Sequence, residues 1–117
     1  MARLFVYGTL KRGYSRAEAL RGEVYLGTAK TEARYRMYNC GDYPGLVESP
    51  DGLSIEGELW EVSPACLKRL DEIEGVGIKL YKRAKVRLKT PHDRHEVETY
   101  LYLRSTERMP DCGVKWV

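Results

Sequence analysis

The segment Arg3-Leu4-Phe5-Val6-Tyr7-Gly8-Thr9 begins with five β-prone residues and then turns at a glycine. Residues 55–62 alternate in polarity, and residues 84–89 and 97–103 repeat this period-2 pattern of a half-buried strand. Residues 24–38 are rich in Thr and Tyr and predict one long strand or two short ones. Because short strands predominate, we expect a closed or nearly closed antiparallel sheet with one or two helices packed on it.

Turn signals separate these strands. Gly41-Asp42-Tyr43-Pro44-Gly45 predicts a loop, because Gly and Pro interrupt regular pairing, and a short strand is expected to begin at Leu46. Residues 15–20 predict a short helix, and residues 90–94 are expected to join the last two strands as a hairpin.

The composition fits one folded domain, which we expect to span residues 1–117. Hydrophobic residues make up 43% of the chain and charged residues 32%, which suits one core with a solvated surface. The net charge is only +3 and basic residues are interspersed with acidic ones, so we expect no nucleic-acid partner. No secretory leader and no membrane-spanning apolar stretch is recognisable, so we expect no membrane partner and a cytoplasmic location.

Cysteines and histidines give no sign of a metal site. Cys40, Cys66 and Cys112 lie far apart and form no C-x-x-C pair, which favours free structural thiols. His92 and His95 are close in sequence, but no third ligand is clustered nearby, so a chance surface pair is favoured. We expect neither a metal nor a cofactor.

A helix is predicted between the strand at 55–62 and the strand at 84–89. Ser63-Pro64 predicts its start, with serine as the N-cap and proline at the first helical position. The helix is expected to reach Ile73 or Glu74 and to end at Gly75.

One acidic residue of this helix is placed unusually. Glu74 lies seven positions after Leu67 and therefore falls on the apolar side, whereas Glu72 points away and Asp71 lies at the margin. The apolar stripe itself consists of Cys66, Leu67, Leu70 and Ile73.

A carboxyl group in this position has the chemistry of a general acid–base catalyst. Burial raises the pKa of a carboxyl group, and the partial negative charge at a helix C-terminus acts in the same direction. A pKa near neutrality is what proton transfer by a side chain requires. A structural role is as open as the catalytic one, because helix ends shift by a residue or two. In that role Glu74 either caps its helix or pairs with Arg83 at the surface.

The glycine turn after the first strand is the second candidate feature. Successive backbone N–H groups in Val6-Tyr7-Gly8-Thr9-Leu10 can form an anion-binding concavity, and glycine lets a ligand approach closely. On its own, however, the segment favours an ordinary β-turn.

Five elements along the chain form a recognisable order. Tyr7-Gly8-Thr9-Leu10-Lys11-Arg12-Gly13 matches Y-G-T-L-x-x-G, and Leu70-Asp71-Glu72-Ile73-Glu74-Gly75 matches L-D-x-x-E-G. Tyr43-Pro44-Gly45-Leu46 and Gly57-Glu58-Leu59-Trp60-Glu61-Val62 lie between them, and Tyr81-Lys82-Arg83 follows as Y-x-R. Each motif is short, but the ordered set resembles the γ-glutamylcyclotransferase-like family, in particular its small bacterial and archaeal γ-glutamylamine cyclotransferase-type members.

The resemblance implies a fold and a site. The fold would be α+β, a small mixed, mostly antiparallel β-barrel with one or two flanking helices. Glu74 would be the catalytic glutamate. The residues expected to contact the substrate are Tyr7, Gly8, Thr9, Leu10, Tyr43 and Tyr81. Residues 76–79 depart from the family pattern, which leaves the specificity for the leaving group open.

The resemblance also implies a γ-glutamylcyclotransferase-type acyltransferase, monomeric or homodimeric, that acts on a small-molecule γ-glutamyl amide. Glu74 would take a proton from the substrate's α-amine, which attacks the γ-carbonyl, and would then protonate the departing amine, releasing 5-oxoproline. One alternative is a non-catalytic member of the same fold that binds a small ligand or a protein. A weaker alternative is an RNA-associated protein that uses Lys85, Arg87 and Lys89.

Overall fold

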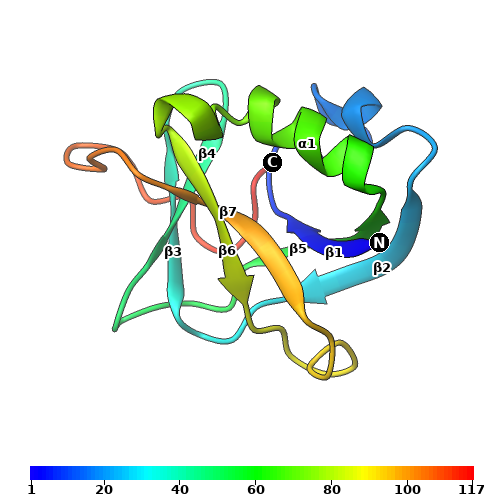
Figure 1. Ribbon diagram of the computed structural model, residues 1–117. Helices are drawn as coiled ribbons and strands as arrows, with labels where there is room; N and C mark the ends of the chain where they lie inside the picture. Colours follow the sequence, from blue (N-terminus) through cyan, green and yellow to red (C-terminus); the bar gives the residue numbers. More distant parts are fainter.

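The computed structural model describes all residues from Met1 to Val117 and contains seven strands, one α-helix and two 3-10 turns (Figure 1). In chain order the elements are β1 (Ala2–Val6), η1 (Ala17–Leu20), β2 (Val24–Lys30), β3 (Tyr35–Asn39), β4 (Pro44–Glu48), β5 (Glu56–Val62), α1 (Pro64–Ile73), η2 (Val76–Ile78), β6 (Tyr81–Val86) and β7 (Val97–Tyr102).

Five strands form one mixed sheet in the order β2-β5-β1-β7-β6, and β3 and β4 pair as a separate antiparallel hairpin. The two central strands, β1 and β7, run parallel, whereas the other neighbours are antiparallel. The α+β class with a mostly antiparallel mixed sheet is therefore confirmed.

The expected barrel is not formed, because the sheet does not close. Closure requires continuous pairing between the two outer strands, β2 and β6. Beyond these strands a single bridge joins Thr31 and Leu88, and the β3–β4 hairpin stays outside the sheet order.

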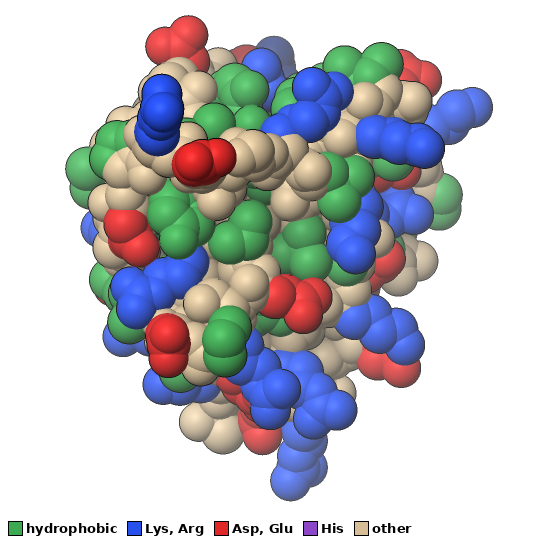
Figure 2. Space-filling view, turned by 90° about the vertical axis from the view of Figure 1, so that its left-hand side faces the viewer, with side chains coloured by type: hydrophobic (Ala, Val, Ile, Leu, Met, Phe, Trp, Pro, Cys, Tyr) green, Lys and Arg blue, Asp and Glu red, His purple; other side chains and the backbone are tan.

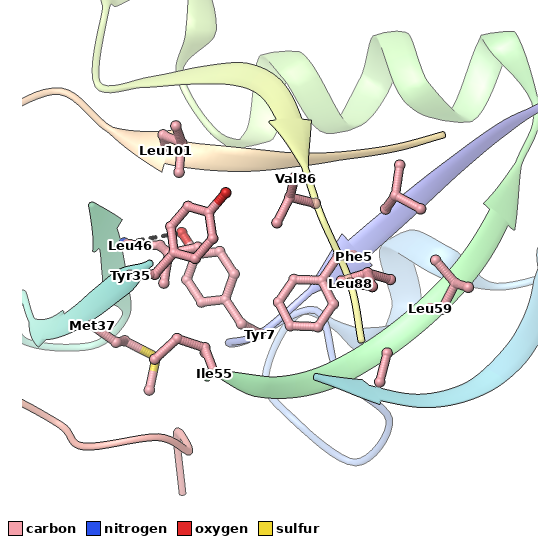
Figure 3. Packing of buried hydrophobic residues seen from close by; sticks show 12 residues of the cluster. Phe5, Tyr7, Tyr35, Met37, Leu46, Ile55, Leu59, Val86, Leu88 and Leu101 are labelled. Atoms are coloured by element: carbon pink, nitrogen blue, oxygen red, sulfur yellow. Dashed lines mark hydrogen bonds between the residues drawn. The ribbon is translucent and has the colours of Figure 1, made fainter. Parts of the chain in front are cut away.

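Strand β1 is buried on both faces, which explains its unbroken apolar run. Because side chains alternate along a strand, Leu4 and Val6 pack into the cluster beneath α1, while Phe5 and Tyr7 enter the opposite cluster. Figure 3 shows Phe5 and Tyr7 among the buried side chains of this opposite cluster, with Met37 and other residues of the β3–β4 hairpin. The end of β1 thus lies at the centre of the molecule.

Helix α1 starts as predicted. The Ser63 hydroxyl accepts a hydrogen bond from the Cys66 N–H at 3.1 Å, and Pro64 is the first helical residue. Cys66 and Leu70 are fully buried, but Ile73 is 41% exposed, so its predicted place in the buried stripe is wrong. The buried face instead runs through Cys66 and Leu70, four residues apart, and the next position on this row is Glu74.

Three predicted boundaries differ from the structure. Strand β4 begins at Pro44 rather than Leu46, because proline, which has no N–H, is tolerated as a first strand residue. The turn within residues 15–20 is a single 3-10 turn. Strand β6 begins at Tyr81, opposite Tyr102, and ends at Val86 instead of spanning 84–89.

Charges of both signs are distributed over the surface. On the face shown in Figure 2, Lys and Arg side chains lie among Asp, Glu and apolar side chains. Neither the helix nor the 3-10 turns have the length and apolar character needed to span a membrane.

Candidate active site

Glu74 lies directly after the last helical residue and holds an unpaired carboxyl group. Its backbone N–H donates to the Leu70 carbonyl at 2.9 Å, and Gly75 then leaves the helix with a left-handed φ of 69°. That conformation suits glycine and ends the helix at this point. The Glu74 carboxylate takes part in no hydrogen bond and no ion pair with the protein, and the residue is only partly exposed.

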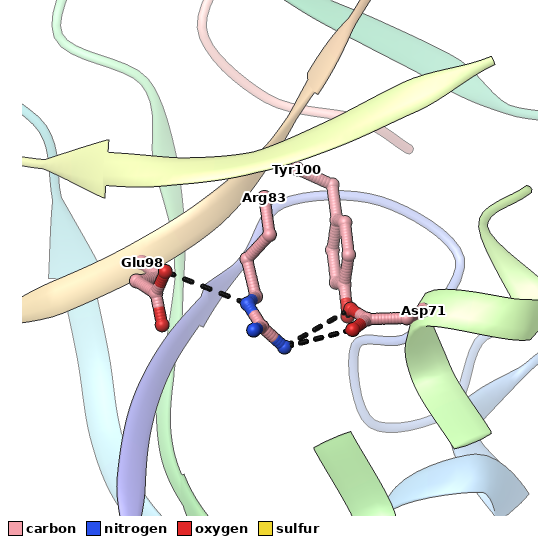
Figure 4. Close-up of polar contacts among 4 residues, drawn as sticks. All are labelled: Asp71, Arg83, Glu98 and Tyr100. Carbon is pink, nitrogen blue, oxygen red and sulfur yellow. Dashed lines mark hydrogen bonds and ion pairs between the residues drawn. The ribbon is translucent and has the colours of Figure 1, made fainter. Parts of the chain in front are cut away.

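The surface pair between Glu74 and Arg83, one of the structural roles left open by the sequence, is absent. Arg83 is instead bound by Asp71 at 2.9 Å and by Glu98 at 3.4 Å (Figure 4). Nor does the Glu74 side chain cap the helix through a hydrogen bond.

The environment of Glu74 favours its protonated form. Burial raises the pKa of this carboxyl group from 4.5 to about 7, although the nearby Arg16 guanidinium lowers it. The negative charge of Glu74 in turn contributes to raising the pKa of three pocket tyrosines, Tyr7, Tyr81 and Tyr100, after the larger effect of their own burial. A carboxyl group that titrates near neutrality can both accept and return a proton.

The turn after β1 carries donors without acceptors. The Lys11 N–H donates to the Gly8 carbonyl at 3.1 Å and closes the turn, while the N–H groups of Gly8, Thr9 and Leu10 donate to no protein acceptor. Thr9 and Leu10 are 7% and 4% exposed. Buried backbone donors are almost always paired, and leaving one unpaired costs about 1–3 kcal/mol. Three consecutive free donors at a cavity wall can hold an acceptor group.

Gly8 also lies very close to the neighbouring loop. A Cβ atom at this position would lie 2.6 Å from Cγ of Pro44, which is too close for any side chain. Glycine is therefore required here for close packing.

The predicted tyrosines form the walls, and two of their hydroxyl groups are already bound. The Tyr7 hydroxyl donates to the Tyr100 carbonyl at 2.6 Å and accepts from the Leu46 N–H at 3.3 Å. The Tyr81 hydroxyl donates to the Pro44 carbonyl. Together they fix β4 against β7 and position the walls of the site. The Tyr43 ring lies 6.3 Å from that of Tyr81.

The structure brings all the predicted site residues around one cavity. Glu74, from the end of α1, faces the same cavity as the turn after β1, and the full predicted set that lines it is Tyr7, Gly8, Thr9, Leu10, Tyr43, Glu74 and Tyr81. Their chemical roles stay predictions.

Four lining residues were not predicted: Phe5, Val6, Pro44 and Tyr100. Tyr100 matters most, because it is 3% exposed although the alternation along β7 placed it on a polar face. Strand β7 lies between β1 and β6 with α1 above it, so both of its faces are covered. The aromatic pair Tyr100 and Tyr102 was the available sequence signal for this second buried face.

The sequence of the chain also matches a known protein family. The profile described as "Gamma-glutamyl cyclotransferase, AIG2-like" matches residues 4–116, nearly the whole chain. The chain belongs to the γ-glutamyl cyclotransferase, AIG2-like family. The resemblance of the ordered motifs is thereby confirmed.

Relatives and a solved structure agree with this membership. The γ-glutamylaminecyclotransferase of Homo sapiens is 33% identical over 91% of this chain and 80% of its own length. A candidate γ-glutamylcyclotransferase of Arabidopsis thaliana is 36% identical over 96% of this chain, which spans only 63% of that protein. The crystal structure of an AIG2-like protein from Mus musculus has a TM-score of 0.84 at 26% identity, covering 95% of this chain and 85% of that one.

Proposed function

We propose that this γ-glutamyl cyclotransferase family member is an active enzyme that cyclises the γ-glutamyl group of an amide and releases 5-oxoproline and a free amine or amino acid. One observation carries the proposal: the unpaired Glu74 carboxyl group lines the same cavity as a turn with three free backbone donors. An acid–base group and an anion-binding wall are the two parts that this reaction needs.

The turn residues Gly8, Thr9 and Leu10 would bind the γ-glutamyl part of the substrate. No Lys or Arg side chain lines this cavity, so its donors for an anionic group are the backbone N–H groups of the turn and the hydroxyls of Thr9 and Tyr43. The close contact between Gly8 and Pro44 keeps this wall fixed.

In the proposed reaction Glu74 accepts a proton from the substrate's α-ammonium group, and the free amine attacks the γ-carbonyl carbon. Donors in the pocket stabilise the resulting oxyanion; the bond to the leaving nitrogen then breaks as Glu74 returns the proton to it. The attacking nitrogen, positively charged after the attack, gives up its second proton to water or to the departing amine and becomes the lactam N–H. Both reacting groups belong to one molecule, and holding them in the ring-closing position is worth on the order of 7–11 kcal/mol. No metal or cofactor is required by this sequence of steps.

The name of the human relative supports the nature of the leaving group. That protein is a γ-glutamylaminecyclotransferase, so a γ-glutamyl group joined to an amine is the substrate class that we propose for this chain. The segment Val76–Ile78, which directly follows Glu74 and Gly75, would lie on the leaving-group side.

Mass spectrometry of 5-oxoproline release from a panel of γ-glutamyl amides tests the proposal. The wild-type protein should release 5-oxoproline from at least one amide. Glu74→Gln should lose about 10²–10⁴ in rate, the usual contribution of a positioned general base. Glu72→Gln is the matched control, because Glu72 is an exposed residue of the same helix end. Full activity in Glu74→Gln would disprove the assigned role, and binding of the panel without release would favour a non-catalytic member.

A further inference from the structure

A cluster of charged and polar side chains lies beside the cavity and joins the end of α1 to the sheet (Figure 4). Asp71 of α1 accepts two hydrogen bonds from Nη1 of Arg83, at 2.9 and 3.1 Å, and a third from the Tyr100 hydroxyl at 2.7 Å. Arg83 belongs to β6 and Tyr100 to β7. Neighbouring strands therefore bind one helical carboxylate, which is 27% exposed.

Tyr100 connects this cluster to the cavity. Its side chain lines the cavity and its hydroxyl binds Asp71, while its backbone carbonyl accepts the hydrogen bond from the Tyr7 hydroxyl. Tyr7 is the residue that precedes the free N–H groups of the turn. Tyr100 thus contacts the helix end through its hydroxyl and Tyr7, at the start of the turn, through its backbone carbonyl.

Glu74 depends on the backbone for its placement, because its own carboxylate binds no protein group. It follows Asp71 by three residues, and its N–H makes the last helical hydrogen bond, to Leu70, before Gly75 turns the chain away. Helix ends fray unless tertiary contacts hold them. Asp71 supplies the polar contacts between this last turn and the sheet, through Arg83 and Tyr100.

We propose that Asp71 is a positioning residue: by binding Tyr100 and Arg83 it holds the last turn of α1 so that the Glu74 carboxyl group stays over the cavity, opposite the turn after β1. This inference rests on the proposed function for its consequence in catalysis. The placement of Glu74 itself can be measured without turnover.

Several ionisable groups surround Glu74, of which Arg16 lowers its pKa, and they set the baseline for such a measurement. Arg16 approaches from the loop after β1, and the hydroxyls of Tyr7, Tyr81 and Tyr100 approach from the strands. Cys40 acts on Tyr7 and Tyr81. Of these groups only the Tyr100 hydroxyl is a partner of Asp71, whereas Arg16, Tyr7 and Tyr81 make no hydrogen bond or ion pair with it. The titration of Glu74 in Asp71→Asn is therefore read together with that in Tyr100→Phe.

The test is Asp71→Asn in the intact chain. We expect kcat to fall about 10–100-fold with KM changed less than about twofold, because the reacting groups are misplaced while the turn that binds the substrate is intact. Carbon-13 NMR of the side-chain carboxyl groups should show the pKa of Glu74 falling from about 7 towards 4.5, since a loosened helix end admits water. Glu72→Gln, which removes a neighbouring exposed charge, should change neither quantity.

Tyr100→Phe provides the second variant should Asp71→Asn fail to fold. It removes only the hydrogen bond to Asp71 and should give smaller changes in the same directions. The double variant should be no worse than Asp71→Asn, since both substitutions break one connection. Glu98→Gln breaks the other ion pair of Arg83 and should leave kcat unaltered.

Two results would overturn the inference. One is an Asp71→Asn protein of reduced thermal stability that keeps both kcat and the pKa of Glu74, which would show a purely structural role. The other is an unchanged Glu74 titration in Tyr100→Phe. If the wild type releases no 5-oxoproline but Asp71→Asn still lowers the pKa of Glu74, the proposed function fails while the positioning role stands.

Discussion

Glu58 and Glu74 are two largely buried glutamates whose surroundings differ completely. Glu58, in β5, is 9% exposed and accepts hydrogen bonds from the Arg12 N–H at 3.0 Å and from Nε1 of Trp60 at 3.2 Å. The Arg12 guanidinium adds an ion pair at 3.6 Å. The Glu74 carboxylate has no hydrogen-bond or ion-pair partner, although the residue is only partly exposed and lines a cavity; only the charge of the more distant Arg16 favours its ionised form.

The difference lies in how the lost hydration of each carboxylate is compensated. A buried charge is tolerated when hydrogen bonds and an opposite charge compensate its lost hydration, as at Glu58. Without such compensation, burial costs stability and raises the pKa, as at Glu74. The proposed role in proton transfer accounts for an uncompensated carboxyl group at this position.

The largest expected effect is a stability change of opposite sign at the two sites. At pH 8, Glu74→Gln should raise the free energy of unfolding by up to about 3 kcal/mol, because it removes a buried charge whose pKa is shifted from 4.5 to about 7. Glu58→Gln should lower it by about 1–3 kcal/mol, because it disrupts charge-assisted hydrogen bonds. Urea unfolding of both variants measures these differences.

The pH dependence of that gain provides a control. Folded Glu74 holds its proton more tightly than the unfolded chain does, so wild-type stability falls as pH rises from about 4.5 to about 7. The advantage of Glu74→Gln should therefore shrink to about 1 kcal/mol at pH 5. An equal gain at pH 5 and pH 8 would contradict an uncompensated charge at Glu74.

The next effect is on activity. In the proposed reaction Glu74 is a base only when deprotonated, so kcat/KM should fall about tenfold for each pH unit below its pKa of about 7. At pH 5 the wild-type enzyme should be about 100-fold slower than on its plateau. Glu58→Gln should keep the same acid limb, whereas the residual activity of Glu74→Gln should lack it. An acid limb near pH 4.5 in the wild type would argue that Glu74 is fully hydrated.

The sequence predicts the surroundings of Glu74 better than those of Glu58. Periodicity alone placed Glu74 on the inner side of the helix, because the caps at Ser63 and Gly75 fixed the length of α1. It assigned Glu58 to a polar strand face, yet the loop after β1 covers that face and supplies its partner Arg12. Local alternation predicts which residues share a face, but only the tertiary structure determines whether both faces are covered.

The pairing of Asp71 was equally out of reach. It depends on which strands lie beneath the end of the helix, and therefore on the sheet order β2-β5-β1-β7-β6. The closed barrel was wrong for the related reason that strand patterns do not define sheet edges. The free N–H groups after β1 could be suspected from the glycine, but showing that they are unpaired requires every acceptor around the turn to be known.

The smallest predicted effect distinguishes the two arginines near these glutamates. Arg16 lowers the pKa of Glu74, so Arg16→Gln should move the acid limb of kcat/KM to higher pH. The displacement should be less than about one pH unit, because an exposed charge contributes at most about 1 kcal/mol. Arg12→Gln is the matched control, since Arg12 pairs with Glu58 instead, and it should leave the limb in place. Equal displacements in both variants would mean that the limb follows the net charge of the protein rather than the field at Glu74.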